Sequence, residues 1–67
     1  MQNVVVNGKD VPGLSGKTVL TGLNELGFDP ETVVVEMNGE IVSVSDFDQI
    51  IVPEGAVLEV LRFVGGG

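Results

Sequence analysis

The sequence predicts an α+β roll, in which a mixed sheet of four to five strands carries one helix packed on one face. Two hairpins are indicated because Asn7-Gly8 and Asn38-Gly39 each follow a β-branched run, and Asn-Gly accepts the positive φ angles of a two-residue turn. One helix is indicated because residues 15–28 hold an apolar stripe between a capping signal and a terminating glycine. The 67 residues suit one domain.

The first hairpin is expected to be short on its returning side. Its first strand is the β-branched run 4–6, and its second strand begins at Lys9. Pro12 has no N–H to donate to a strand ladder, and Gly13 follows it directly. We therefore expect the returning strand at an edge of the sheet.

The helix has signals at both of its ends. Thr18, or Ser15 one turn earlier, is expected to cap the first amides, and Gly27 to end the helix in a left-handed conformation with Phe28 folded back. Gly22 inside the helix costs about 1 kcal/mol relative to Ala, which a close approach to the sheet would explain. The apolar stripe consists of Val19, Leu20, Leu23 and Leu26.

A second strand pair is predicted on either side of Asn38-Gly39. Alternation places Val33, Val35 and Met37 on one face of the first strand. Val34 lies on the other face, together with Glu36.

Residues 45–55 form a turn-rich connection to the last strand. We expect one short helical turn there, capped by Ser45, with Phe47 inserted into the core. Residues 56–63 then form a strand with apolar side chains on both faces, which is typical of a central strand.

The order of elements is hairpin, helix, strand, short strand, loop and last strand. One helix covers one face of such a sheet and leaves the other face open to water. For the chain to close in this way, its first and last strands should lie side by side and parallel in the middle of the sheet. This is the β-grasp, or ubiquitin-like, arrangement. We assign residues 1–63 to this domain and residues 64–67 to a flexible glycine tail.

The composition argues against an enzyme that acts alone. The chain has no Cys, His, Tyr or Trp, so the usual bases and nucleophiles are absent, as are disulfides and the usual zinc ligands. Asp46 and Asp48 lack the ligand spacing of a calcium loop and are assigned to a solvated or capping turn. No catalytic residue, bound cofactor or metal site is expected.

The charge balance bears on partners and location. Ten acidic residues against three basic ones give a formal net charge of -7, which argues against nucleic acid and anionic membranes as partners. It suits a small protein steered toward a basic surface on a partner. No apolar run approaches the roughly 20 residues of a membrane span, and no signal-peptide pattern opens the chain. We expect a cytoplasmic protein that is a monomer when free.

Four stretches together carry a family resemblance. They are the N-terminal hairpin, the helix "TVLTGLNEL" that opens at Thr18, the segment "VVVEMNGEIV" at 33–42, and an apolar last strand that runs into "VGGG". With these stretches the chain resembles the ThiS family of sulfur-carrier proteins in the ThiS/MoaD superfamily. Many members follow the fourth strand with Pro-Arg and an aromatic residue. Here "SVSDF" keeps only the aromatic, Phe47, which puts in doubt any partner contact made by that Arg.

The resemblance implies that the Gly67 carboxylate is the reacting group. Its attack on the α-phosphate of ATP gives an acyl-adenylate, and sulfur then displaces AMP to leave a thiocarboxylate that serves thiamine thiazole synthesis. The implied partners are a ThiF-like or MoeB-like adenylating enzyme that uses the ATP, a thiazole synthase, and a sulfur donor such as a cysteine desulfurase. The tail, Val64, Gly65, Gly66 and Gly67, would reach about 13 Å when extended and, having little side-chain bulk, enter a narrow partner site.

Alternation in the last strand also predicts a docking surface. If Leu58 and Val60 face the helix, apolar residues emerge on the open face and form a patch typical of a binding site. The alternatives for these residues are ordinary central-strand packing or a weak dimer contact. For Arg62 two pairings stay open, one with an acidic group of a partner and one with Glu59. The residues of the predicted patch are Val5, Val34, Leu61 and Phe63.

Three functions stay open at this point. The first is the thiazole sulfur carrier, and the second is the same chemistry in molybdopterin synthesis (MoaD-like) or in ubiquitin-like protein modification. MoaD-like chains usually have extra helical material between the helix and the third strand. Here the connection is only residues 27–32, which leaves no room for such an insertion. The third is a β-grasp interaction module without covalent chemistry, for which deletion of Gly67 would cost nothing.

Overall fold

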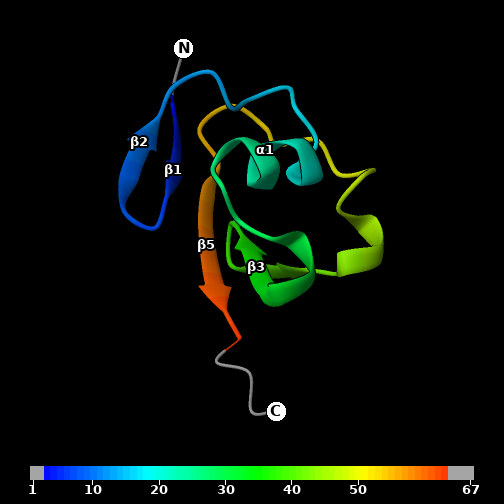
Figure 1. Ribbon diagram of the computed structural model, residues 1–67. Coiled ribbons are helices and arrows are strands. Elements are labelled where there is room, and N and C mark those ends of the chain that lie inside the picture. Colours follow the sequence, from blue (N-terminus) through cyan, green and yellow to red (C-terminus); the bar gives the residue numbers. More distant parts are fainter. Residues whose placement is uncertain (1–2, 64–67) are drawn as a thin grey trace.

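A five-stranded mixed sheet organises the molecule. The computed structural model describes residues 3–63, and its strands lie in the order β2-β1-β5-β3-β4 (Figure 1). β1 and β5 pair in parallel at the centre, and the other neighbours are antiparallel. The predicted β-grasp arrangement is therefore confirmed. The strand bounds are β1 (Val4–Val6), β2 (Lys9–Val11), β3 (Val33–Met37), β4 (Glu40–Val42) and β5 (Val57–Arg62).

Both hairpins turn at the predicted Asn-Gly pairs. Asn7 and Asn38 each have a φ of 51°, and the glycines after them have φ of 83° and 86°. Positive φ at both central residues is the geometry of a type I′ turn, whose twist matches that of the paired strands. The short strand β2 lies at one edge of the sheet, as predicted, and β4 lies at the other.

Helix α1 (Val19–Glu25) is capped by Thr18 and not by Ser15. The backbone N–H of Thr21 donates to Thr18 Oγ1 at 3.1 Å, which satisfies one of the free amides of the first turn. Gly27 has a φ of 85° and ends the helix as expected. Leu26, the last member of the predicted stripe, remains 36% exposed.

Two short 3-10 turns complete the chain. The first, η1 (Pro30–Thr32), was not foreseen, and Asp29 caps it by accepting from the N–H of Glu31 at 3.0 Å. The second, η2 (Val44–Asp46), begins earlier than the sequence suggested, with Ser43 at its N-cap. The prediction that Ser45 is the cap is wrong, because Ser45 lies inside the turn and its hydroxyl lies 3.0 Å from that of Ser43.

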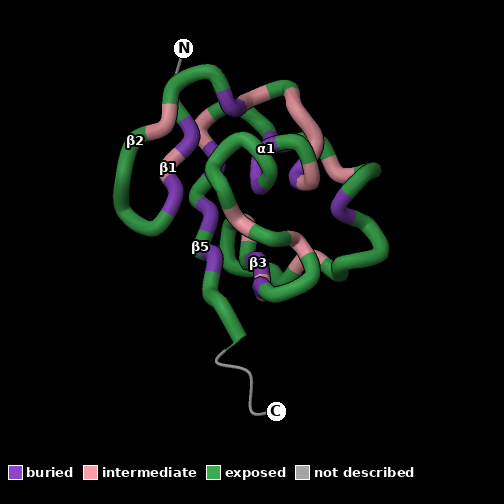
Figure 2. Tube along the Cα trace, viewed as in Figure 1, coloured by how far each residue is buried: buried purple, intermediate pink, exposed green. Residues whose placement is uncertain are grey.

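The core lies between the sheet and the helix, and the buried stretches in Figure 2 cluster there. Phe47 is 2% exposed and fills the core as predicted. Leu14, from the loop before α1, is also buried and lies over Gly22. A Cβ on Gly22 would stand 3.1 Å from Leu14 Cδ1, so the close approach at Gly22 is to this loop residue and not to the sheet. The buried strand residues are Val4, Val6, Val33, Val35, Leu58 and Val60.

No helix among residues 3–63 has the length and apolar character needed to cross a membrane.

Candidate functional site

The end of strand β5 is the described element nearest in sequence to the predicted reacting group. The backbone N–H of Phe63 donates to the carbonyl oxygen of Thr32 at 2.8 Å, so the chain is still tied to the end of η1 at the last described residue. Figure 1 shows β5 running through the middle of the molecule to its lower edge. The predicted tail residues Val64, Gly65, Gly66 and Gly67 lie outside the described residues.

Both Asn-Gly turns hold β5 through their side chains. The Asn7 amide accepts from the N–H of Val60 at 2.7 Å and donates to the carbonyl oxygen of Val60 at 3.1 Å. Asn38 Oδ1 accepts from the N–H of Val57 at 2.9 Å. β1 ends at Val6, so the Asn7 side chain takes the place of the next strand residue. The side chains of Asn7 and Asn38 thus hold β5, the strand that leads to the tail, in place.

Sequence reasoning identified the two asparagines only as turn residues. Their side-chain roles depend on β5 lying beside both turns, and no local pattern encodes that neighbourhood.

Arg62 does not pair with Glu59, and a contact with an acidic group of a partner stays a prediction. Its guanidinium lies 5.7 Å from the centroid of the Phe28 ring, a cation–π distance. Arg62 pairs with Val33 in the sheet and so lies on the helix side, whereas Glu59 lies on the open side. Phe28 in turn is held by its N–H, which donates to the carbonyl oxygen of Leu23 at 2.9 Å.

Three of the four predicted docking residues lie together at the end of the sheet. Val34 and Leu61 are direct cross-strand partners, and Phe63 lines one cavity with Val34. Leu61 is 63% exposed and Phe63 is 60% exposed. Val5 lies further along the same face, where it pairs with Val57.

Sequence reasoning missed two residues of this face, Ile41 and Val57. Ile41 is 72% exposed and Val57 is 46% exposed. Ile41 pairs with Glu36, so alternation across the second hairpin was the signal that would have found it. We call the apolar residues of this face the open-face patch: Val5, Val34, Ile41, Val57, Leu61 and Phe63.

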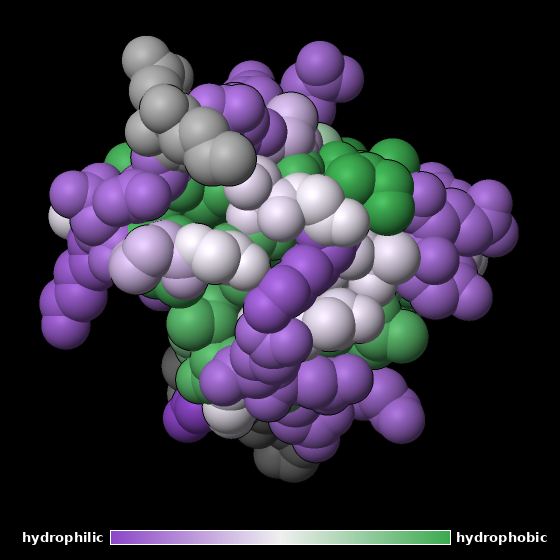
Figure 3. All heavy atoms as spheres, turned by 90° about the horizontal axis from the view of Figure 1, so that it is seen from above, coloured by the Kyte–Doolittle hydropathy of each residue, from purple (hydrophilic) through white to green (hydrophobic). Residues whose placement is uncertain are grey.

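Exposure of apolar groups is not confined to this face. The view from above in Figure 3 shows hydrophobic side chains exposed between hydrophilic ones, as on most folded proteins. What distinguishes the open-face patch is that its members lie next to one another on the sheet face that the helix does not cover.

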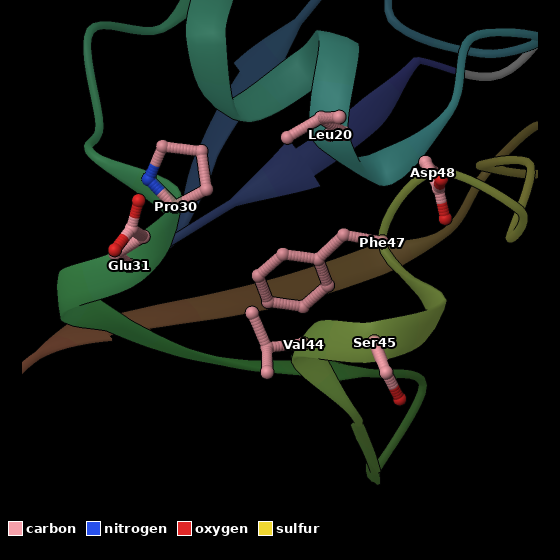
Figure 4. Close-up of a pocket in the computed structure, with 7 residues that line it drawn as sticks. All are labelled: Leu20, Pro30, Glu31, Val44, Ser45, Phe47 and Asp48. Atoms are coloured by element: carbon pink, nitrogen blue, oxygen red, sulfur yellow. The ribbon is translucent and has the colours of Figure 1, made fainter.

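Two cavities flank Phe47. One, of about 240 Å³, lies at the end of the sheet beside Phe63 and Ile41. The other, of about 350 Å³, lies on the helix side, where Leu20 and Val44 surround the Phe47 ring (Figure 4). It is mainly apolar. The cavity is also lined by Glu31 and Asp48, but within residues 3–63 the Ser45 hydroxyl pairs with the Ser43 hydroxyl and not with either carboxylate.

Acidic groups do not converge on a common point either. Within the described part of the chain, no group of three or more acidic residues could hold a metal ion. The described residues thus present an apolar sheet face beside β5, the strand that leads to residues 64–67.

Comparison with known proteins supports this description. The model of the ThiS family matches residues 4–67. A crystal structure of the thiamine biosynthesis protein ThiS from Geobacter metallireducens is 39% identical, with a TM-score of 0.79 over 98% of this chain and 100% of that one. A solution structure of a thiamine biosynthesis protein from the same organism gives a TM-score of 0.77, again at 39% identity, over 98% of this chain and 88% of that one.

Two curated relatives are much longer than this chain. A thiazole synthase of Paramagnetospirillum magneticum is 42% identical over 64 residues, which are 96% of this chain and 20% of the relative. A thiazole synthase of Magnetococcus marinus is 37% identical over 62 residues, which are 92% of this chain and 19% of the relative. The chain spans about a fifth of the length of these relatives.

Proposed function

The chain belongs to the ThiS family, and from this we propose that it is a sulfur carrier for thiamine thiazole synthesis, a protein co-substrate and not an enzyme. The observation that carries the proposal is the extent of the family match, which runs from β1 through the terminal glycines. The fold supports this proposal, because an exposed apolar sheet face lies beside a strand that is held by both Asn-Gly turns and leads to residues 64–67.

The proposed chemistry takes place at the Gly67 carboxylate. One carboxylate oxygen attacks the α-phosphate of ATP, pyrophosphate leaves, and an acyl-adenylate forms. A sulfur nucleophile from a donor such as a cysteine desulfurase then attacks the acyl carbon, and AMP leaves with the bonding electron pair. When the donor sulfur is a persulfide, this attack gives an acyl disulfide. A thiol reductant then cleaves the S–S bond and ends in a disulfide with the donor sulfur, so that a thiocarboxylate remains on Gly67.

These steps belong to a ThiF-like or MoeB-like adenylating enzyme, which binds the ATP. The carrier holds no cofactor of its own, and we place the reaction in the cytoplasm, where ATP is available.

The open-face patch is the proposed docking surface for that enzyme. Leu61 and Phe63 are its most useful members because they lie on the strand that leads to the tail. With Leu61 docked outside, residues 64–67 would span about 13 Å into the partner. Leu61→Asp should therefore reduce adenylation, and unchanged adenylation would contradict this docking surface.

Thiazole synthase is the proposed recipient of the sulfur. The two curated relatives that match this chain are named thiazole synthases and contain a similar segment within a longer protein. Fusion of a carrier to the enzyme that consumes its product is a natural arrangement, which favours thiazole over the molybdopterin and protein-modification alternatives.

The test is an intact-mass measurement on the protein isolated from its own cells and on the purified 67-residue chain. The proposal requires Gly67 to carry a free carboxyl group. After incubation with ATP, the adenylating enzyme and a sulfide source, the mass should rise by the difference between sulfur and oxygen, localised to Gly67.

The matched control is the chain that lacks Gly67, which should stay unmodified. The enzyme must be shown to be active by its conversion of another carrier protein. If the mass of the full chain stays unchanged with such an enzyme, a non-covalent interaction module is favoured instead.

A further inference from the structure

The charged residues of the sheet are divided between its two faces. Lys9 pairs with the buried Val6, and Arg62 pairs with the buried Val33, so both basic strand residues lie on the helix side. The third basic residue, Lys17, precedes α1 and forms an ion pair with Glu25 at 2.7 Å. The charged strand residues left on the open face are all acidic: Asp10, Glu36 and Glu59.

Two of these carboxylates oppose one another at the centre of the sheet. Glu36 and Glu59 are direct cross-strand partners in β3 and β5, a position in which Cβ atoms lie about 5 Å apart and like charges are unfavourable. Neither side-chain carboxylate has an ion pair or hydrogen bond with another residue of the range 3–63. Arg62, close by in sequence, is on the other face over Phe28.

Apolar side chains surround this pair. Glu59 lies between Val57 and Leu61 along β5, and Glu36 lies between Val34 on its own strand and Ile41 on the neighbouring one. The repulsive pair is therefore at the middle of the open-face patch and not at its rim. An apolar patch with a doubly acidic centre is complementary to an apolar surface that presents a cation.

We propose that the open-face patch binds a partner surface on which a lysine or arginine side chain projects from apolar surroundings and inserts between Glu36 and Glu59. The inference rests on the proposed function in one respect, because the adenylating enzyme is the partner on which it is tested. The cation would satisfy both carboxylates at once. The surrounding contacts would exclude water, which strengthens charge-assisted hydrogen bonds.

A second copy of this chain does not fit the same face. In a two-fold dimer the same patch lies on both subunits, and the charged strand residues that each open face contributes are all carboxylates. Like charges placed opposite one another suppress such an association. A basic partner is therefore favoured over self-association through this surface.

The test compares charge removal inside and outside the patch. Glu36→Gln, Glu59→Gln and the double variant remove the central charges with little change of shape. Glu40→Gln is the matched control, because Glu40 pairs with Met37 on the helix side of an edge strand. For each protein we would measure the dissociation constant for the ThiF-like adenylating enzyme of the same organism and the thermal midpoint of the isolated carrier.

The affinity for the enzyme and the stability of the isolated carrier should move in opposite directions. The double variant should bind at least about 10-fold more weakly, as expected when one side of a desolvated charge pair is lost, yet unfold at a higher temperature because the repulsion is gone. For each single variant, the dissociation constant and the thermal midpoint should lie between those of the wild type and the double variant. Glu40→Gln should bind like the wild type.

Different failures have different meanings. If the wild type binds the enzyme and the double variant binds it equally well, the cation proposal is overturned and the carrier function stays intact. Loss of binding together with a lower thermal midpoint also overturns it, because the glutamates would then act through stability. No binding and no modification of the wild-type chain would overturn the carrier function, and this inference with it.

Discussion

Asn7 provides the most direct test of how the tail-bearing strand is held. Its amide makes two hydrogen bonds to Val60, whereas Asn38 makes one side-chain bond to Val57. Glycine at either position keeps the positive φ and removes only the side-chain contacts. We expect Asn7→Gly to lower the free energy of unfolding by about 2 kcal/mol and Asn38→Gly by about half as much.

Urea unfolding of the two variants gives this comparison, and each serves as the control for the other. Equal losses would mean that the bonds to Val60 contribute little beyond the turn itself.

Gly22 is a residue where two physical effects oppose each other. Helix propensity alone predicts that Gly22→Ala stabilises the fold by about 1 kcal/mol. The new Cβ, however, would meet the buried Leu14 side chain at 3.1 Å, and a packed core resists added volume. We expect the net change in unfolding free energy to be near zero.

The same substitution in a Leu14→Ala background separates the two effects. With the neighbour shortened, Gly22→Ala should recover a gain of about 1 kcal/mol, measured by chemical denaturation in a double-mutant cycle. If the gain is the same in both backgrounds, the contact with Leu14 does not limit this position.

At the scale of elements, helix α1 depends on one cap. Its seven residues are too few for an isolated helix to be stable in water, so the bond from the Thr21 N–H to Thr18 Oγ1 matters. We expect Thr18→Ala to cost about 1 kcal/mol of unfolding free energy, whereas Thr18→Ser keeps the acceptor and costs little. Thermal unfolding followed by circular dichroism measures both.

Ser15→Ala controls for the other cap that the sequence offered. A loss at Ser15 as large as the loss at Thr18 would show that the helix begins one turn earlier.

The elements that were predicted correctly are those with complete local signals. Asn7-Gly8 and Asn38-Gly39 set their hairpins by backbone geometry alone, and Gly27 ends the helix in the same way. Turn η1 was missed because residues 27–32 were considered only as a short connection between the helix and the third strand, although Asp29-Pro30 is a good start for a 3-10 turn.

The candidate site was partly predictable for a similar reason. Alternation placed Val34 and Leu61 on one face, and the structure adds that they are direct partners. The opposition of Glu36 and Glu59 required the register of β3 against β5, which is set by tertiary packing over a long sequence separation.

At the scale of the whole molecule, the net charge of -7 predicts how salt affects the carrier. At about 0.01 M salt, charges interact over roughly 30 Å, which exceeds the radius of gyration of 11.2 Å. The acidic groups then repel one another throughout the molecule and destabilise the folded state. At about 0.15 M the range falls to roughly 8 Å, so added NaCl should raise the thermal midpoint.

The expected rise is several degrees, because in a domain of this size about 1 kcal/mol corresponds to roughly 4–8 °C. Differential scanning calorimetry of the isolated chain measures it, and the Glu36→Gln/Glu59→Gln variant should respond less because it carries two fewer negative charges. The same salt should weaken binding to a basic partner, since screening acts on attraction as it does on repulsion. A midpoint that falls with added NaCl would contradict the repulsion and show that stabilising ion pairs outweigh the excess negative charge.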